Sequence, residues 1–128
     1  MVELNVTIGK TKTIELEVTK ERTALHIGSG SIGVLSTPSM IASMEKASAL
    51  NAQEDLPEGY TTVGTVVCIT HNKAVKQGET VQAISEIKSQ DRRKIEFAVK
   101  VLYKGELVGE GKHERFIINE ENFLSKLP

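Results

Sequence analysis

One segment of the chain has the full signature of a long helix: residues 36–52, STPSMIASMEKASALNA. The Thr37 hydroxyl suits the N-cap, where it accepts a hydrogen bond from a free backbone N–H, and Pro38 suits the first helical position, which needs no N–H. No further Gly or Pro occurs before Ala52. Helical spacing gathers apolar and small residues on one face, which we expect to be buried: Met40, Ile41, Met44, Ala47 and Ser48.

Alternating runs of residues on both sides of this helix predict strands. The clearest run is Lys94–Lys104, in which apolar residues from Ile95 to Tyr103 occupy every second position. Short connections between the later runs imply antiparallel pairing, and a helix on one face of such a sheet is an α+β architecture. We expect the helix to pack on the sheet face that contains Phe97 and Val99. The predicted strands are Val2–Thr7, Lys12–Val18, Tyr60–Thr70, Glu79–Lys88, Lys94–Lys104 and Leu107–Ile118.

The composition is that of one soluble domain over residues 1–128, with 39% hydrophobic and 26% charged residues. Its 16 Lys and Arg nearly balance its 17 Asp and Glu, so charge gives no argument for a nucleic-acid or membrane-surface partner. No apolar run is long enough to span a membrane and the N-terminus lacks the pattern of a signal peptide, so we expect a cytoplasmic protein. Aromatic residues make up only 4%, and a subunit interface would add to the burial that so small a core provides.

Neither the cysteine nor the histidines indicate a metal site. The single cysteine, Cys68, excludes an intrachain disulfide and a cysteine-based zinc site, and its apolar neighbours indicate a small core residue. The three histidines, His26, His71 and His113, lack the spacing of metal ligands, so no metal is expected.

A glycine-rich motif, GSGSIG at Gly28–Gly33, matches the pattern of dinucleotide-binding loops. That function needs a strand before the motif, a helix that begins within it, and a parallel crossover. The helix signal here begins only near Thr37, and antiparallel strands follow it. We therefore favour a loop that borders a pocket, within a longer loop expected over residues 19–35.

Three polar residues each have a structural and a functional interpretation. An N-cap role already explains Thr37, although a helix N-terminus also favours an anion or a polarised carbonyl. Glu45 lies at the edge of the apolar helix face, where it is either a solvated residue or a partly buried base or nucleophile. His71 ends a predicted strand and is either solvent-exposed or a proton carrier.

His113 and Arg115 lie two positions apart and therefore share one face of the last strand. They are either surface residues paired with glutamates of neighbouring strands or contacts to an anion, because a guanidinium suits phosphate and carboxylate groups.

Several stretches of the chain together match a known family. They are Val34–Pro38, Met44-Glu45, Leu56–Gly59, Thr62–Thr65, His71, and the closing run Gly109-Glu110-Gly111-Lys112-His113-Glu114-Arg115. With them the chain resembles a hot-dog-fold thioesterase, and within that family the fluoroacetyl-CoA thioesterase-like subgroup. The resemblance extends from about Leu16 to Ile118.

The resemblance implies a hot-dog fold, in which a curved antiparallel β-sheet wraps a long central helix. It implies a homodimer with active sites at the subunit interface, or a tetramer. It also implies hydrolysis of an acyl-CoA thioester, with coenzyme A as part of the substrate and no cofactor. The matching catalytic residues are Thr37, Glu45 and His71. Gly64 matches a residue that holds the thioester carbonyl by its backbone N–H, and Arg115 matches a candidate contact to the CoA portion.

The residue types of this set fit the reaction, because a thioester carbonyl needs a nucleophile or activated water and a donor to the developing oxyanion. Glu45 would attack directly to form an acyl-enzyme anhydride, or act as a base toward water, and both routes stay open. Thr37 would position Glu45 or the substrate. His71 would hold the attacking water or protonate the leaving thiolate.

One feature departs from the subgroup. Its fluoroacetyl-specific members have an aromatic lid before the helix, whereas no Phe, Tyr or Trp lies between Met1 and Pro57 here. The sequence therefore predicts a more open or differently gated pocket rather than fluoroacetyl selectivity. The alternative function is a non-catalytic hot-dog domain that binds an acyl-CoA or a related ligand. No feature favours a hydratase.

Overall fold

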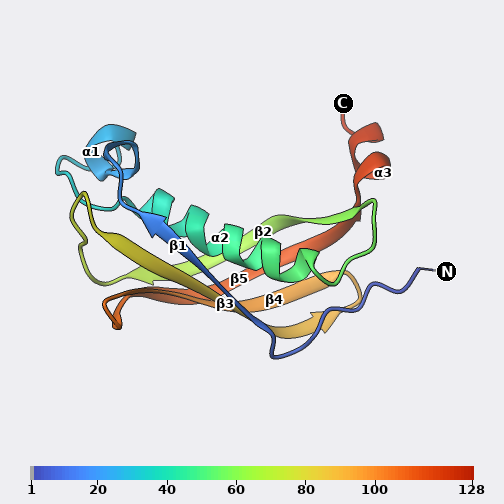
Figure 1. The fold of residues 1–128 in the computed structure, drawn as a ribbon. Coiled ribbons are helices and arrows are strands. Elements are labelled where there is room, and N and C mark those ends of the chain that lie inside the picture. Colours follow the sequence, from blue (N-terminus) through green and yellow to red (C-terminus); the bar gives the residue numbers. More distant parts are fainter. Residues whose placement is uncertain (1) are drawn as a thin grey trace.

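The computed structural model of the chain describes residues 2–128. Five strands and one long helix form its framework (Figure 1). In chain order the elements are β1 (Thr11–Glu17), η1 (Lys20–Arg22), α1 (Ala24–Ile27), α2 (Thr37–Gln53), β2 (Tyr60–His71), β3 (Thr80–Asp91), β4 (Lys94–Tyr103), β5 (Glu106–Asn119) and α3 (Glu120–Ser125).

The five strands form one sheet in the order β1-β3-β4-β5-β2, and every neighbouring pair is antiparallel. Figure 1 shows the sheet curving along α2, which lies against one of its faces. The predicted α+β fold is therefore confirmed. Because the sheet formed by residues 2–128 contains no parallel pair, the glycine motif before α2 lacks the crossover that dinucleotide binding requires.

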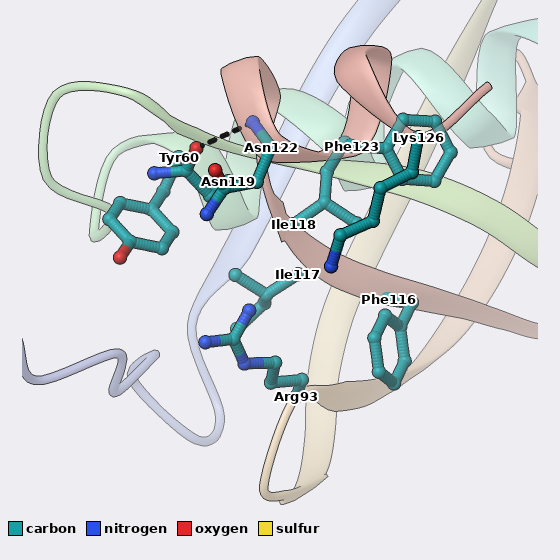
Figure 2. A pocket seen from close by; sticks show the side chains of 9 residues that line it. All are labelled: Tyr60, Arg93, Phe116, Ile117, Ile118, Asn119, Asn122, Phe123 and Lys126. Atoms are coloured by element: carbon teal, nitrogen blue, oxygen red, sulfur yellow. Dashed lines mark hydrogen bonds between the residues drawn. The ribbon is translucent and has the colours of Figure 1, made fainter.

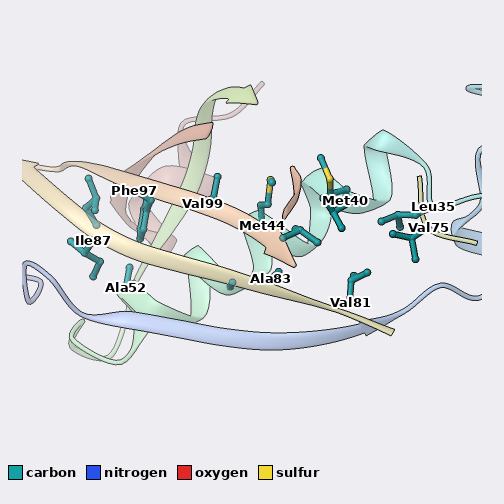
Figure 3. Close-up of a cluster of buried hydrophobic side chains, with 14 of the residues drawn as sticks. Leu35, Met40, Met44, Ala52, Val75, Val81, Ala83, Ile87, Phe97 and Val99 are labelled. Atoms are coloured by element: carbon teal, nitrogen blue, oxygen red, sulfur yellow. The ribbon is translucent and has the colours of Figure 1, made fainter. Parts of the chain in front are cut away.

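The core lies between α2 and the sheet. Met40 and Met44 of α2 are fully buried together with Phe97 and Val99 of β4, as the sequence pattern predicts (Figure 3). Ile41, assigned to the same helix face, is only half-buried. Burial of one such large apolar side chain contributes about 2 kcal/mol, so this layer fixes the helix on the sheet.

The start of α2 corrects one prediction. Ser36 is the N-cap, and its side chain accepts a hydrogen bond from the Ser39 backbone N–H at 3.1 Å. Thr37, predicted as the cap, is instead the first helical residue. Both residues carry the same kind of acceptor, but the buried Ser36 occupies the extended conformation that an N-cap needs. The Thr37 hydroxyl is therefore not used for capping.

Two predictions in the N-terminal third are also wrong. Residues 2–7 form no strand, because side chains rather than a neighbouring strand satisfy their backbone: the Val6 N–H donates to Gln90 and the Thr7 N–H to Asp55. The segment expected as a loop over residues 19–35 contains the short helices η1 and α1. The Ala24 N–H donates to the Val34 carbonyl at 2.8 Å, so this segment folds back on itself before α2.

The prediction that Cys68 is a core residue is wrong as well. Cys68 is exposed, because β2 is an edge strand that pairs only with β5, and nothing in the described residues covers Gly64–Cys68. Val66 and Val67 in this stretch are also exposed, at 43% and 38%. One long strand of the sheet thus presents an uncovered apolar edge.

Within residues 2–128, no helix is long and apolar enough to cross a membrane.

Candidate active site

The first group of candidate residues lies where α2 begins and β2 ends. Thr37 Oγ1 and His71 Nδ1 form a hydrogen bond of 2.8 Å. Because Ser36 caps the helix, this bond is the one hydrogen bond formed by the Thr37 hydroxyl among the described residues. A hydroxyl and an imidazole within hydrogen-bonding distance are the elements of an activated nucleophile or of an oriented base.

The surroundings of His71 favour its neutral form. Burial lowers the pKa of His71 below its ordinary value of 6.5, so the imidazole is uncharged near pH 7. Its second nitrogen, Nε2, is buried and has no hydrogen-bond partner in the described part of the chain. Buried polar atoms in folded proteins are normally paired, and an unpaired one at this position marks a nitrogen that is free to take part in proton transfer.

The second group surrounds Glu45, two turns further along α2. The Glu45 side chain is half-buried, with 40% of its surface exposed, and Oε2 lies 3.6 Å from Nη1 of Arg115. Gly64 of β2 lies beside the same carboxylate, and a Cβ atom at Gly64 would approach Glu45 Oε2 to 2.7 Å. Any residue other than glycine at position 64 would therefore displace the Glu45 carboxylate. The Glu45 side chain is therefore partly buried, and its role as a base or nucleophile stays a prediction.

Gly64 also precedes an irregularity in the sheet. It pairs with Arg115 of β5, and the register then shifts by one residue before Val66 pairs with Glu114. Such β-bulges are common beside active sites, where they redirect a strand. The bulge places the exposed backbone of Gly64 next to Glu45.

Arg115 lies in the interior, with an exposed fraction of 8%. Nε donates to Thr62 Oγ1 at 2.7 Å and Nη2 donates to the Thr62 carbonyl at 3.1 Å. Nη1 lies 3.1 Å from Nε2 of His113. All three guanidinium nitrogens are thus directed at protein groups, and the expected contact of Arg115 to the CoA portion stays a prediction.

The two groups do not meet within the described residues of the chain. Thr37 and Glu45 are eight positions apart on α2, which separates their backbones by about 12 Å along the helix axis. No hydrogen bond or ion pair within residues 2–128 joins Thr37 or His71 to Glu45, Gly64 or Arg115. The residues predicted to form one catalytic set therefore occupy two places in the chain.

Thr62 and the Val66 carbonyl belong to this region but were not predicted from the sequence. Both lie on β2 and contact side chains of β5 that are about 50 positions away in the sequence. The sequence does contain a partial signal: Gly109, Gly111, His113 and Arg115 alternate along one strand. At Gly109 a Cβ would lie 2.7 Å from Met40 Sδ, so the glycines permit close packing and leave the polar contacts to the last two residues.

A pocket at the far end of the sheet lies outside both groups. It has a volume of about 310 Å³ and lies between the end of β5 and α3 (Figure 2). None of the candidate residues lines it; its wall includes Tyr60, Arg93, Phe116, Phe123 and Lys126. Within residues 2–128 no three His, Cys, Asp or Glu side chains are grouped as metal ligands.

Comparison with known proteins places these residues in a family. The model of the family described as fluoroacetyl-CoA-specific thioesterase matches residues 18–121. A fluoroacetyl-CoA thioesterase from Streptantibioticus cattleyicolor is 32% identical over 94 residues, which cover 73% of this chain and 68% of that protein.

Solved structures agree with this result. The fluoroacetyl-CoA thioesterase FlK, as a mutant in complex with acetyl-CoA, superposes with a TM-score of 0.88 at 28% identity, covering 94% of this chain and 96% of that one. A thioesterase superfamily member from Thermus thermophilus, with a TM-score of 0.87, 23% identity and coverage of 94% and 90%, shares the fold. The chain therefore has the hot-dog fold and belongs to the fluoroacetyl-CoA-specific thioesterase family of thioester hydrolases.

Proposed function

We propose that the protein hydrolyses an acyl-CoA thioester to a carboxylic acid and free CoA, with Thr37, Glu45 and His71 as its catalytic residues. The hydrogen bond between Thr37 Oγ1 and His71 Nδ1 carries this proposal. Helix capping does not account for the Thr37 hydroxyl, because Ser36 provides the cap, and the bond links the hydroxyl to a neutral imidazole. The relatives that act on fluoroacetyl-CoA support the substrate class.

Hydrolysis joins a water oxygen to the carbonyl carbon and breaks the carbon–sulfur bond, so a proton must leave the water and the CoA thiolate must gain one. We assign Glu45 either the removal of the water proton or direct attack on the carbonyl; the second route passes through an anhydride that water then opens. His71 holds the attacking water. In the base route the proton that Glu45 removes passes through His71 to the thiolate, and in the direct route the thiolate receives, through His71, a proton from the water that opens the anhydride. Thr37 keeps the His71 ring in position.

Gly64 is the proposed donor to the carbonyl oxygen. Its backbone is exposed and adjoins the Glu45 carboxylate. A backbone N–H fixed at a bulge needs no reorganisation when negative charge develops on the oxygen, which is the property of an effective oxyanion donor.

We propose further that two protomers together form each active site. The two groups of residues are separated along one chain, and the edge of β2 is uncovered over Gly64–Cys68. Pairing of two such edges in antiparallel fashion reverses one strand relative to the other. With a two-fold axis between Val67 and Cys68, the His71 end of one β2 lies beside the partner subunit's Gly64. The Thr37–His71 pair of one protomer then faces the Glu45 carboxylate of the other.

We propose that the segment before α2 influences which acyl group the protein accepts. It contains only aliphatic apolar side chains that are exposed, namely Leu25, Ile27 and Ile32, and no aromatic ring. Aliphatic side chains have no ring edge or face to distinguish a C–F from a C–H bond, so we propose that the protein accepts aliphatic acyl groups without selectivity for fluorine.

The test is release of free thiol from a panel of acyl-CoA esters, from acetyl and fluoroacetyl to medium chains. Glu45→Gln removes the carboxylate charge and keeps the side-chain shape, and the rate should fall about 10²- to 10⁴-fold. Lys46→Gln, at the neighbouring exposed position, is the matched control and should retain full activity. Absence of thiol release from every ester, with binding retained, would instead establish the alternative of a non-catalytic acyl-CoA-binding domain. Equal rates for the wild type and Glu45→Gln would refute the role of Glu45.

A further inference from the structure

His113 is the most deeply buried titratable residue near the carboxylate, with an exposed fraction of 1%. It lies on β5, where its ring stacks on Phe97 of β4 with a centroid distance of 5.9 Å. None of the steps proposed above uses it. A buried imidazole beside a buried guanidinium is costly unless the two are hydrogen-bonded to compatible partners.

The partners of His113 fix its protonation state. Nδ1 lies 2.7 Å from the Val66 carbonyl, which can only accept, so Nδ1 carries the proton. Nε2 lies 3.1 Å from Nη1 of Arg115, which can only donate, so Nε2 offers its lone pair. Both contacts therefore require the neutral imidazole with its proton on Nδ1. Burial also lowers the pKa of His113, which favours this neutral form.

The same contacts determine where the Arg115 charge lies. Thr62 holds Nε and Nη2, and His113 accepts from Nη1, so each guanidinium nitrogen has an acceptor other than Glu45. The distance from Nη1 to Glu45 Oε2 is 3.6 Å, beyond a normal hydrogen bond of about 3 Å but close enough for charge attraction.

We propose that His113 is a positioning residue, which holds Arg115 close to Glu45 while keeping the guanidinium from binding the carboxylate directly. This inference rests on the proposed function of Glu45. A bidentate arginine would occupy both carboxylate oxygens, and these would then be unavailable to water or to a carbonyl carbon. Because Arg115 is held by His113 and Thr62, Glu45 keeps its charge balanced and its oxygens free.

The anchor of this arrangement is the bulge in β2. His113 donates to Val66, the residue at which pairing resumes after the register shift that follows Gly64. One hydrogen-bonded chain thus runs from the bulge through His113 to Arg115, next to Glu45. It couples the position of the proposed oxyanion donor to the position of the carboxylate.

Two variants of His113 separate its contact with Arg115 from its contact with Val66. In His113→Gln the amide oxygen reaches the place of Nε2 and still accepts from Arg115. In His113→Asn the shorter amide still donates to Val66 but leaves Arg115 without its acceptor. We expect kcat to fall about tenfold to a hundredfold in His113→Asn, and clearly less in His113→Gln, with KM nearly unchanged in both. Lys112→Gln, on the opposite face of β5, is the control and should match the wild type.

If His113 had a purely structural role, both variants would have lower melting temperatures, and the kcat of the folded protein would be the same in both. That result would overturn the proposal. Equal loss of kcat in both variants at equal melting temperature would also overturn it.

A second measurement does not depend on activity. Nitrogen-15 NMR of the imidazoles, assigned by loss of signals in His113→Gln, should show the neutral tautomer of His113 with the proton on Nδ1 at about pH 7. The opposite tautomer, or a charged ring, would overturn the proposal even in an active enzyme. Absence of thiol release by the wild type would instead refute the proposed function, and the positioning role would be lost with it.

Discussion

The two halves of the candidate site differ in how they are built. In the part of the chain that the structure describes, Thr37 and His71 form a single hydrogen bond at the junction of a helix and a strand, and one imidazole nitrogen is unpaired. On the other side, Arg115 and His113 lie in the interior beside Glu45, and hydrogen bonds through Thr62 and Val66 hold both in place.

This contrast separates two tasks. A group that moves protons needs a neutral form near working pH and an unpaired nitrogen, and His71 has both. A group that supplies a fixed charge must be held rigidly, and hydrogen bonds to three acceptor atoms hold the Arg115 guanidinium in this way. Variants at the two halves should therefore fail in different ways.

The largest difference in activity and stability is expected between variants of two neighbouring hydroxyl residues at the start of α2, Thr37 and Ser36. Thr37→Ala removes the partner of His71 and should lower kcat about 10²- to 10³-fold with little change in stability, because Ser36 provides the helix cap. Ser36→Ala should do the opposite: the free energy of unfolding falls by about 1 kcal/mol and activity per folded molecule persists. Thiol-release kinetics and urea unfolding of both variants measure the two effects. A stability loss in Thr37→Ala with unchanged kcat would contradict the assignment.

A smaller effect is expected at the carboxylate half. Gly64→Ala places a Cβ at 2.7 Å from Glu45 Oε2 and must displace the end of that flexible side chain. We expect kcat to fall about tenfold or more while the melting temperature changes little. Gly33→Ala is the matched control, because a Cβ there meets nothing within 4 Å. If the two alanine variants have the same kcat, the carboxylate does not need the space that Gly64 leaves.

The smallest effect is a dependence of stability on pH. The pKa values of His71 and His113 are lowered in the folded protein, mainly by burial, so below 6.5 the unfolded chain binds protons that the folded chain does not. The stability that these residues contribute is present above pH 6.5 and is lost as the pH falls below it. We expect the melting temperature to drop by a few degrees between about pH 7 and about pH 5.

His26, which is exposed at the surface, provides the control for this effect. His26→Gln should keep the drop in melting temperature, and His113→Gln should reduce it. A flat profile in the wild type would show that the two histidines titrate alike in the folded and unfolded chain.

Much of the fold follows from local patterns. The helix bounds, the alternation along β4 and the pairing of His113 and Arg115 on one face all depend on residues close together in the sequence. The N-cap was predicted one residue too late, at Thr37 instead of Ser36, because the two residues are adjacent and equally suited to it. The exposure of Cys68 depends on which strand lies at the edge of the sheet, a property of the whole topology.

The site was predictable only as a set of residue types. Thr37, Glu45 and His71 were named from a family resemblance, but their division into two groups depends on how α2 crosses the sheet. Thr62 and the Val66 carbonyl become partners of Arg115 and His113 only after β2 and β5 have paired. No periodicity in the sequence reports a contact over that distance.

The claim that two protomers share each site has a direct test. Thr37→Ala and Glu45→Gln are each expected to have only residual activity alone, and mixing them by co-expression gives heterodimers. If the two halves come from different protomers, one site of each heterodimer contains an intact Thr37 and an intact Glu45. Random mixing then restores about a quarter of wild-type activity. If no thiol release returns although heterodimers are isolated, both halves act within one chain, and the composite site proposed here is wrong.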